Sequence, residues 1–189
     1  RSMPCAPAFI ATPRTISLPS YGSWSSSALR YERAPLISSS LSFASSGFGA
    51  AAARSFAHAG LDVAGVHLDR RATLPLAEAV AKDVEAAGRR ARFWNANAAD
   101  AGQREAIVAE FGALLRGGPR VRVLLHSLAF GTLKPLVAAE AKEAVSGVQV
   151  AMTLEVMATS LIGWTQALYG AGLFERGARV FAMTSEGGT

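Results

Sequence analysis

The stretch Ala44-Ser45-Ser46-Gly47-Phe48-Gly49 leads directly into a run of four alanines that ends at Ala53. Alanine is the strongest helix former, so a helix is expected to begin at this turn and to end at Gly60. Glycines between a strand and a helix let the backbone approach a pyrophosphate, and the first N–H groups of the helix favour negative charge. The stretch therefore predicts phosphate binding, with a plain turn at a helix start as the alternative.

Beyond this turn, the sequence pattern alternates between strands and helices. Apolar residues at helical spacing predict helices over residues 74–87, 100–115 and 150–173, the second of them capped by Asp100. Short apolar runs predict strands over residues 61–68, 92–94, 121–126 and 178–184. Strands that alternate with helices in this way form a parallel sheet covered on both faces. The sequence therefore predicts an α/β chain with a Rossmann-type, doubly wound parallel sheet.

The composition of the 189-residue chain limits its functional class. Half of the residues are hydrophobic and 17% are charged, which is typical of a soluble globular protein. No apolar run reaches the ~18 residues that a membrane span needs. The net charge of +5 comes without the blocks of lysine, arginine and aromatic residues that bind nucleic acid. The single cysteine, Cys5, has no cluster of metal ligands around it, so neither an internal disulfide nor a metal site is expected.

Residues 1–43 differ in composition from the rest of the chain. Thirteen of the 18 serines lie within the first 46 residues, and Glu32 is the one acidic residue there. Serine- and arginine-rich segments that are poor in acids resemble organelle transit peptides. Three interpretations stay open: a disordered leader, a targeting peptide, or an artefact of gene prediction. We expect a cytoplasmic protein, or an organellar one if the segment is a transit peptide.

The residues after the second predicted strand, His67-Leu68-Asp69-Arg70-Arg71, carry charges of both signs. In nucleotide-binding α/β folds an acidic residue at this place binds the ribose hydroxyls, whereas arginines accommodate a 2′-phosphate. Arg70 and Arg71 therefore favour NADP(H), while Asp69 leaves NAD(H) open. A charged loop in solvent is the alternative.

Four motifs in this order resemble the short-chain dehydrogenase/reductase family. Residues 44–49 resemble its fingerprint Thr-Gly-x-x-x-Gly-x-Gly, and Asn97 lies where the family usually has an aspartate that touches the adenine. Residues 125–130 take the place of its Asn-Asn-Ala-Gly motif, and Ser185 takes the place of its catalytic serine. The resemblance covers about residues 44–189 and implies an NAD(P)-binding domain there. The cofactor-binding residues that it implies are Ser45, Ser46, Gly47, Phe48, Gly49, Asp69, Arg70, Arg71, Asn97, Ser127, Leu128 and Ala129.

The sequence His126-Ser127-Leu128-Ala129-Phe130 is similar to the divergent branch that contains the enoyl-acyl-carrier-protein reductases. Met157 stands near the family's usual helix asparagine, which that branch often lacks. The resemblance implies an NADP(H)-preferring reduction of the 2,3 double bond of an enoyl thioester in fatty-acid synthesis. It also implies a small-molecule or carrier-bound acyl substrate and a homo-oligomer of the intact protein. His126 is interpreted as a wall residue beside the cofactor rather than as a base.

Two departures from the family pattern affect the expected activity. Ser42-Phe43 stands where the family has Thr-Gly, so homology is expected to begin near Ala44. The family's catalytic tyrosine and lysine are expected beyond Ser185, so we interpret the chain as a fragment that is incomplete at the C-terminal end of its sheet and inactive as it stands. The alternatives are a carbonyl or alcohol oxidoreductase of the same family, a non-catalytic nucleotide-binding protein, and a mis-assembled chain that does not fold stably.

Overall fold

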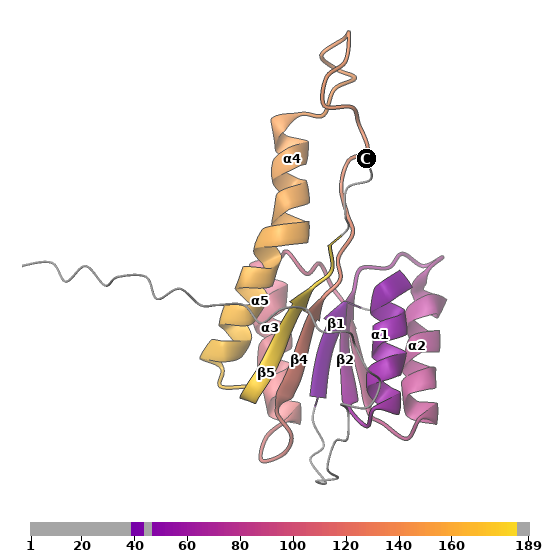
Figure 1. Cartoon of the computed structure of the whole chain (residues 1–189), viewed down its shortest axis with the longest axis vertical. Coiled ribbons are helices and arrows are strands. Elements are labelled where there is room, and N and C mark those ends of the chain that lie inside the picture. The colour runs from indigo at the N-terminus through magenta and orange to yellow at the C-terminus, as the bar shows by residue number, and fades with distance from the viewer. Residues whose placement is uncertain (1–38, 44–46, 185–189) are drawn as a thin grey trace, which may run out of the picture. The chain divides into compact units, whose positions relative to one another are not determined.

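The computed structural model describes residues 39–43 and 47–184, which build one parallel sheet with helices on both faces (Figure 1). The strands are β1 (Ser39–Phe43), β2 (Asp62–His67), β3 (Ala91–Asn95), β4 (Val121–His126) and β5 (Phe174–Ala182), in the order β3-β2-β1-β4-β5. The helices are α1 (Gly47–His58), α2 (Leu74–Ala86), α3 (Ala101–Leu114), α4 (Gly147–Leu154), a π-helical turn η1 (Glu155–Thr159) and α5 (Ser160–Gly170). The predicted Rossmann-type sheet is therefore confirmed. The strand order reverses direction between β1 and β4, and ligands of such sheets bind at the carboxyl ends of the strands beside that point.

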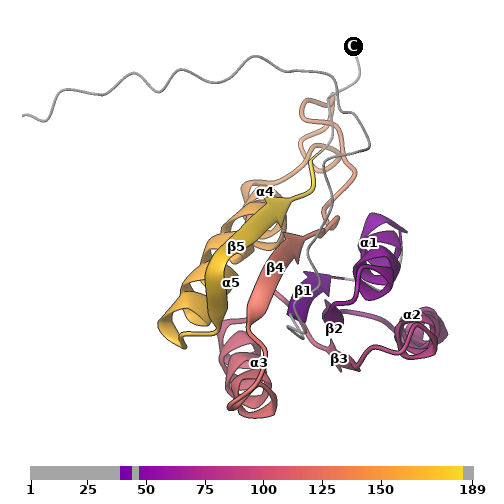
Figure 2. The same cartoon turned by 60° about the horizontal axis from the view of Figure 1, so that its bottom comes forward.

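Two apolar clusters hold the helices against the sheet. On one face, alanines of α1 and valines of α2 pack against Val63 of β2. On the other face, α3 and α5 pack against β2 and β4 around Trp164, which is fully buried. Figure 2 shows α1 and α2 on one side of the strands and α3 and α5 on the other. Every residue of β2 is buried, as expected for a parallel strand covered on both faces.

The strand β1 lies in the centre of the sheet. Its backbone pairs with β2 from Ser39↔Asp62 to Phe43↔Val66, and with β4 on its other side. These five residues belong to the segment 1–43 that the sequence assigned to a leader, and within the described residues they form the first strand of the sheet. Three of the five residues of β1 are serines, which hide the apolar pattern of a strand. The rest of that segment lies outside the described residues.

The long predicted helix runs from Gly147 to Gly170 instead of from 150 to 173. Ser146 begins it with a capping box, in which its hydroxyl accepts from the Gln149 N–H and the Gln149 side chain accepts from the Ser146 N–H. Gly172, with a φ of +65°, ends it. Because the helix ends earlier, β5 also begins earlier than residue 178. The predicted cap of α3 is confirmed, since the Asp100 carboxylate accepts from the Gln103 N–H at 2.8 Å.

The described residues hold no helix of sufficient length and apolar character to cross a bilayer. Within the same ranges, no three histidine, cysteine, aspartate or glutamate side chains gather as a metal site would require.

Candidate functional site

The candidate site lies at the carboxyl ends of the parallel strands. Because these ends share one edge of the sheet, the start of α1 and the segments that follow β2, β3 and β4 lie at that edge (Figure 1). The Met183 N–H donates to the His126 carbonyl at 2.8 Å and holds the end of β5 beside the end of β4. The structure thus brings together the predicted residues of four separate segments: Gly47 to Gly49, Asp69 to Arg71, Asn97, and Ser127 to Ala129.

The glycine turn opens directly into α1. Gly47 has a φ of +57°, which favours glycine, and among the described residues other than its chain neighbours and the backbone of α1 no heavy atom lies within 4 Å of the place where a Cβ would stand. Phe48 is 75% exposed, whereas Gly49 is buried. The first turn of α1 carries no acidic residue, so the positive end of its helix dipole is not neutralised from within the helix. The start of α1 thus has room for an anionic group, and the predicted phosphate contact stays a prediction. Ser45 and Ser46 lie outside the described residues.

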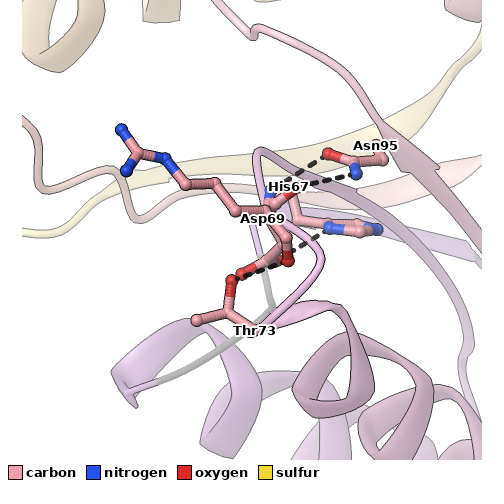
Figure 3. A network of polar contacts seen from close by, with 5 residues as sticks. His67, Asp69, Thr73 and Asn95 are labelled. Carbon is pink, nitrogen blue, oxygen red and sulfur yellow. Dashed lines mark hydrogen bonds and ion pairs between the residues drawn. The ribbon is translucent and has the colours of Figure 1, made fainter.

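The loop after β2 is held by hydrogen bonds to its own strand and to β3 (Figure 3). The Asp69 carboxylate accepts from Nδ1 of His67 at 2.8 Å. The Asp69 N–H donates to Oδ1 of Asn95 at 3.0 Å, and Nδ2 of Asn95 donates back to the Asp69 carbonyl at 2.9 Å. Thr73 donates its hydroxyl to the Arg70 carbonyl at 3.3 Å, immediately before α2 begins. These contacts fix the backbone from which the two arginines project.

Arg70 and Arg71 are both exposed. Within the described residues, neither guanidinium group forms an ion pair or a hydrogen bond. By contrast, Arg54, Arg90 and Arg92 are each paired with a carboxylate. Two adjacent unpaired arginines beside the glycine turn form a positive patch that suits a phosphate group.

Asn97 follows β3 and begins the turn into α3. Its side-chain oxygen accepts from the Ala99 N–H at 3.1 Å, and its own N–H donates to Oε1 of Gln103 at 2.8 Å. Asn97 is exposed. The side-chain oxygen thus stabilises the local turn, and the amide group can donate to a neighbouring base. Its predicted contact with the adenine stays a prediction.

His126 ends β4 and is almost completely buried, with 2% of its surface exposed. Ser160 donates its hydroxyl to the Val156 carbonyl at 2.7 Å, so its oxygen accepts from Nε2–H of His126 at 2.8 Å. Burial lowers the pKa of His126 below its usual value of 6.5. The neutral ring therefore ties β4 to the junction between η1 and α5. Ser160 was not found by sequence reasoning, because 34 residues separate it from His126.

The stability of the fold is expected to fall in mild acid because of His126. Its pKa is lower in the folded chain than in the unfolded one, so the unfolded chain takes up the proton first. The free energy of unfolding should therefore decrease as the pH falls below about 6.5, by at most ~1.4 kcal/mol per pH unit. Urea unfolding between neutral pH and pH 5 measures this slope. His126→Gln should flatten it, whereas His58→Gln, at an exposed position at the end of α1, should leave it unchanged. Equal slopes for the parent chain and His126→Gln would contradict the expectation.

The comparisons with known proteins identify the family to which the chain belongs. A family model described as enoyl-(acyl carrier protein) reductase matches residues 43–189. The chain belongs to the short-chain dehydrogenase/reductase family. The match begins one residue before Ala44, where the sequence predicts that the homology starts. No curated protein matches the chain significantly.

Several solved short-chain dehydrogenase/reductase structures have the same fold. A short-chain dehydrogenase from Burkholderia cenocepacia J2315, crystallised in complex with NADP, is 26% identical, with a TM-score of 0.60 over 77% of this chain and 54% of that chain. A putative short-chain dehydrogenase/reductase from Burkholderia xenovorans is 23% identical, with a TM-score of 0.58 over 72% of this chain and 51% of that one. A 3-oxoacyl-[acyl-carrier protein] reductase from Brucella melitensis is 20% identical, with a TM-score of 0.56 over 71% and 50%. The chain thus spans about half the length of these structures.

The short-chain dehydrogenase/reductase family places its catalytic serine where Ser185 stands in this chain. Ser185 lies outside the described residues, so its role stays a prediction. Met157, which stands near the family's helix asparagine, lies in the π-helical turn η1 and is partly exposed. Ser127 and Leu128 are half-buried beyond β4, and Ala129 is exposed.

Proposed function

We propose that residues 39–184 form the dinucleotide-binding part of an NADP(H)-dependent oxidoreductase that reduces the 2,3 double bond of an enoyl thioester. One observation carries the proposal: an open glycine turn at the start of α1 and two unpaired arginines after β2 follow neighbouring strands of the sheet. The turn supplies backbone N–H groups for a pyrophosphate, and the arginines supply charge-assisted hydrogen bonds for a 2′-phosphate. The residues present therefore fit NADP(H).

The preference for NADP(H) over NAD(H) has two supports. Arg70 and Arg71 are available to a phosphate, while the Asp69 carboxylate already accepts a hydrogen bond from His67. In addition, the relative from Burkholderia cenocepacia was crystallised with NADP. Asn97 is proposed to contact the adenine, and Ser127, Leu128 and Ala129 are proposed to line the cofactor beyond β4.

The enoyl substrate is supported by the description of the matching family model and by the His126-Ser127 variant at the end of β4. When bound, the nicotinamide supplies a hydride for the β-carbon of the enoyl thioester. The negative charge that develops on the thioester oxygen requires hydrogen-bond donors. We assign Ser185 as one accessory donor. The neutral ring of His126 faces Ser160 inside the fold, so it serves as a wall of the site and not as a base.

The cofactor proposal is tested by titrating the chain with NADPH and with NADH and following the binding by calorimetry. We expect NADPH to bind more tightly than NADH. Gly47→Val should weaken both nucleotides, because a β-branched side chain at a φ of +57° is strained and fills the open turn. Gly117→Val is the matched control for backbone strain. Gly117 also has a positive φ, but it lies between α3 and β4, away from the carboxyl ends of the strands. Failure of the parent chain to bind NADPH would refute the proposal.

The substrate class is tested separately with the product of the full reading frame. We expect it to oxidise NADPH in the presence of crotonyl-CoA. If it instead turns over a ketone and not the enoyl thioester, the protein is a carbonyl reductase of the same family. The nucleotide titration is independent of this result, so the cofactor and the substrate proposals can fail separately.

A further inference from the structure

Three residues hold the loop after β2, and we call them the clamp: His67 at the end of β2, Asp69 in the loop, and Asn95 at the end of β3. The side chains of His67 and Asp69 are 4% and 9% exposed, so their hydrogen bond lies within the protein and not on its surface. Asn95 holds both the N–H and the carbonyl of Asp69 with its side-chain amide. Figure 3 shows the side chains of His67, from β2, and Asn95, from β3, directed towards Asp69. His67 therefore holds the carboxylate of Asp69, and Asn95 holds the backbone that carries it.

The packing around His67 keeps the clamp closed. The ring of Phe93 lies over Gly65, where a Cβ would come within 2.5 Å of Cε1, and its centroid lies 6.2 Å from that of His67. The absence of a side chain at Gly65 thus makes room for Phe93 beside the histidine. The His67 carbonyl also accepts a hydrogen bond from the Ala96 N–H, and this bond joins the ends of β2 and β3. With its ring enclosed and its backbone paired, His67 presents Nδ1 to Asp69 in a fixed direction.

This geometry bears on the choice between NADH and NADPH, for which the loop after β2 carries opposing charges. A carboxylate pointing towards the cofactor would accept from a ribose hydroxyl and would repel a 2′-phosphate. The same loop carries Arg70 and Arg71, which attract that phosphate. Because the clamp turns the Asp69 carboxylate to His67, the charge that would favour NADH is withdrawn, and the two arginines are left exposed.

We propose that His67 and Asn95 are positioning residues that set the preference for NADPH over NADH by holding the Asp69 carboxylate inward. The proposal rests on the proposed function, since it concerns selectivity at the same site. According to the proposal, His67 and Asn95 do not touch the cofactor but change the ratio of the affinities for NADPH and NADH. A purely structural role would weaken both nucleotides alike and leave the ratio unchanged.

The test is a double-mutant cycle on the whole chain with NADPH and NADH as the probes. His67→Leu should remove the hydrogen bond that holds the Asp69 carboxylate towards His67 and lower the ratio of the NADH to the NADPH dissociation constant by about ten-fold. Asp69→Ala should keep the preference of the parent chain. The double variant His67→Leu/Asp69→Ala should regain the preference, because no carboxylate remains to turn outwards. Asn95→Ala, at an exposed position, should lower the ratio in the same direction without removing a buried side chain.

The outcomes separate the clamp from the proposed function. A parent chain that prefers NADPH, with unchanged ratios in His67→Leu and in Asn95→Ala, would overturn the clamp and leave the proposed function intact. A double variant that fails to regain the preference would also overturn the clamp, because the loss would then come from distortion of the loop. A parent chain that binds neither nucleotide would overturn both proposals. If His67→Leu does not fold, Asn95→Ala and Asn95→Ala/Asp69→Ala provide the same comparison.

Discussion

Replacing Arg70 and Arg71 together by glutamine is expected to weaken NADPH binding by about ten- to a hundred-fold. NADH binding should stay within about two-fold, because NADH has no 2′-phosphate for the arginines to bind. The two guanidinium groups are exposed and unpaired within the described residues, so their replacement removes no internal contact. The effect should therefore appear in affinity and not in stability.

Calorimetric titration at two salt concentrations measures this effect. The advantage of NADPH over NADH in the parent chain should shrink as salt rises, since exposed charges are screened, and this salt dependence should be lost in the double variant. Arg116→Gln, at an exposed arginine near the end of α3, is the matched control and should change neither affinity. An equal loss of affinity for NADPH and for NADH in the Arg70/Arg71 variant would show that these arginines do not bind the 2′-phosphate.

The largest loss of stability is expected for Trp164→Ala, at about 3–5 kcal/mol of the free energy of unfolding. Trp164 lies in α5, is completely buried, and donates Nε1–H to the Ala98 carbonyl at 2.9 Å. Its truncation would open a cavity between α3, α5 and the sheet and leave the Ala98 carbonyl without this donor. One side chain thus joins the helix to the segment between β3 and α3.

Urea unfolding followed by circular dichroism measures the loss. Tyr169→Ala removes an aromatic ring from the same helix at a position that is 77% exposed, and should change stability by less than ~0.5 kcal/mol. Trp164→Phe keeps most of the apolar contact and loses the hydrogen bond, so it should fall between the two. A loss below ~1 kcal/mol for Trp164→Ala would contradict the described packing of α5.

The alternation of strands and helices was predictable because covered parallel strands are short apolar runs. The pattern is direct in Val121 to His126 and in the run from Leu61 to Leu68, which contains β2. The strand β1 was not predictable from its own residues, since its serines mask the pattern and its place comes from pairing with β2 and β4. Ser146 and Gln149 form a capping box that indicates the start of α4. The prediction used the apolar periodicity instead and placed the start of the helix at residue 150.

The candidate site was predictable where it depends on chain order. Gly47, Asp69 and Asn97 follow successive strands, and parallel pairing brings such residues to one edge. The direction of the Asp69 carboxylate was not predictable, because it depends on Asn95, which is 26 residues away, and on a buried histidine. From the sequence, Arg70 and Arg71 favour NADP(H) while Asp69 leaves NAD(H) open; we propose that the hydrogen bonds of the loop strengthen the preference for NADP(H). Ser45, Ser46 and Ser185 stay predictions, because they lie outside the described residues.

The strand order also shapes how this sheet can assemble during synthesis. The central strand β1 is the first to leave the ribosome among the five, and β2 and β3 follow on one side of it within about half of the described chain. Their pairing and the docking of α1 and α2 need no later residue, so this half can collapse while translation continues. The opposite side of β1 waits for β4, whose residues pair with residues of β1 that lie just over eighty positions earlier in the sequence. That long closure is costly in chain entropy and is the step expected to limit the folding rate.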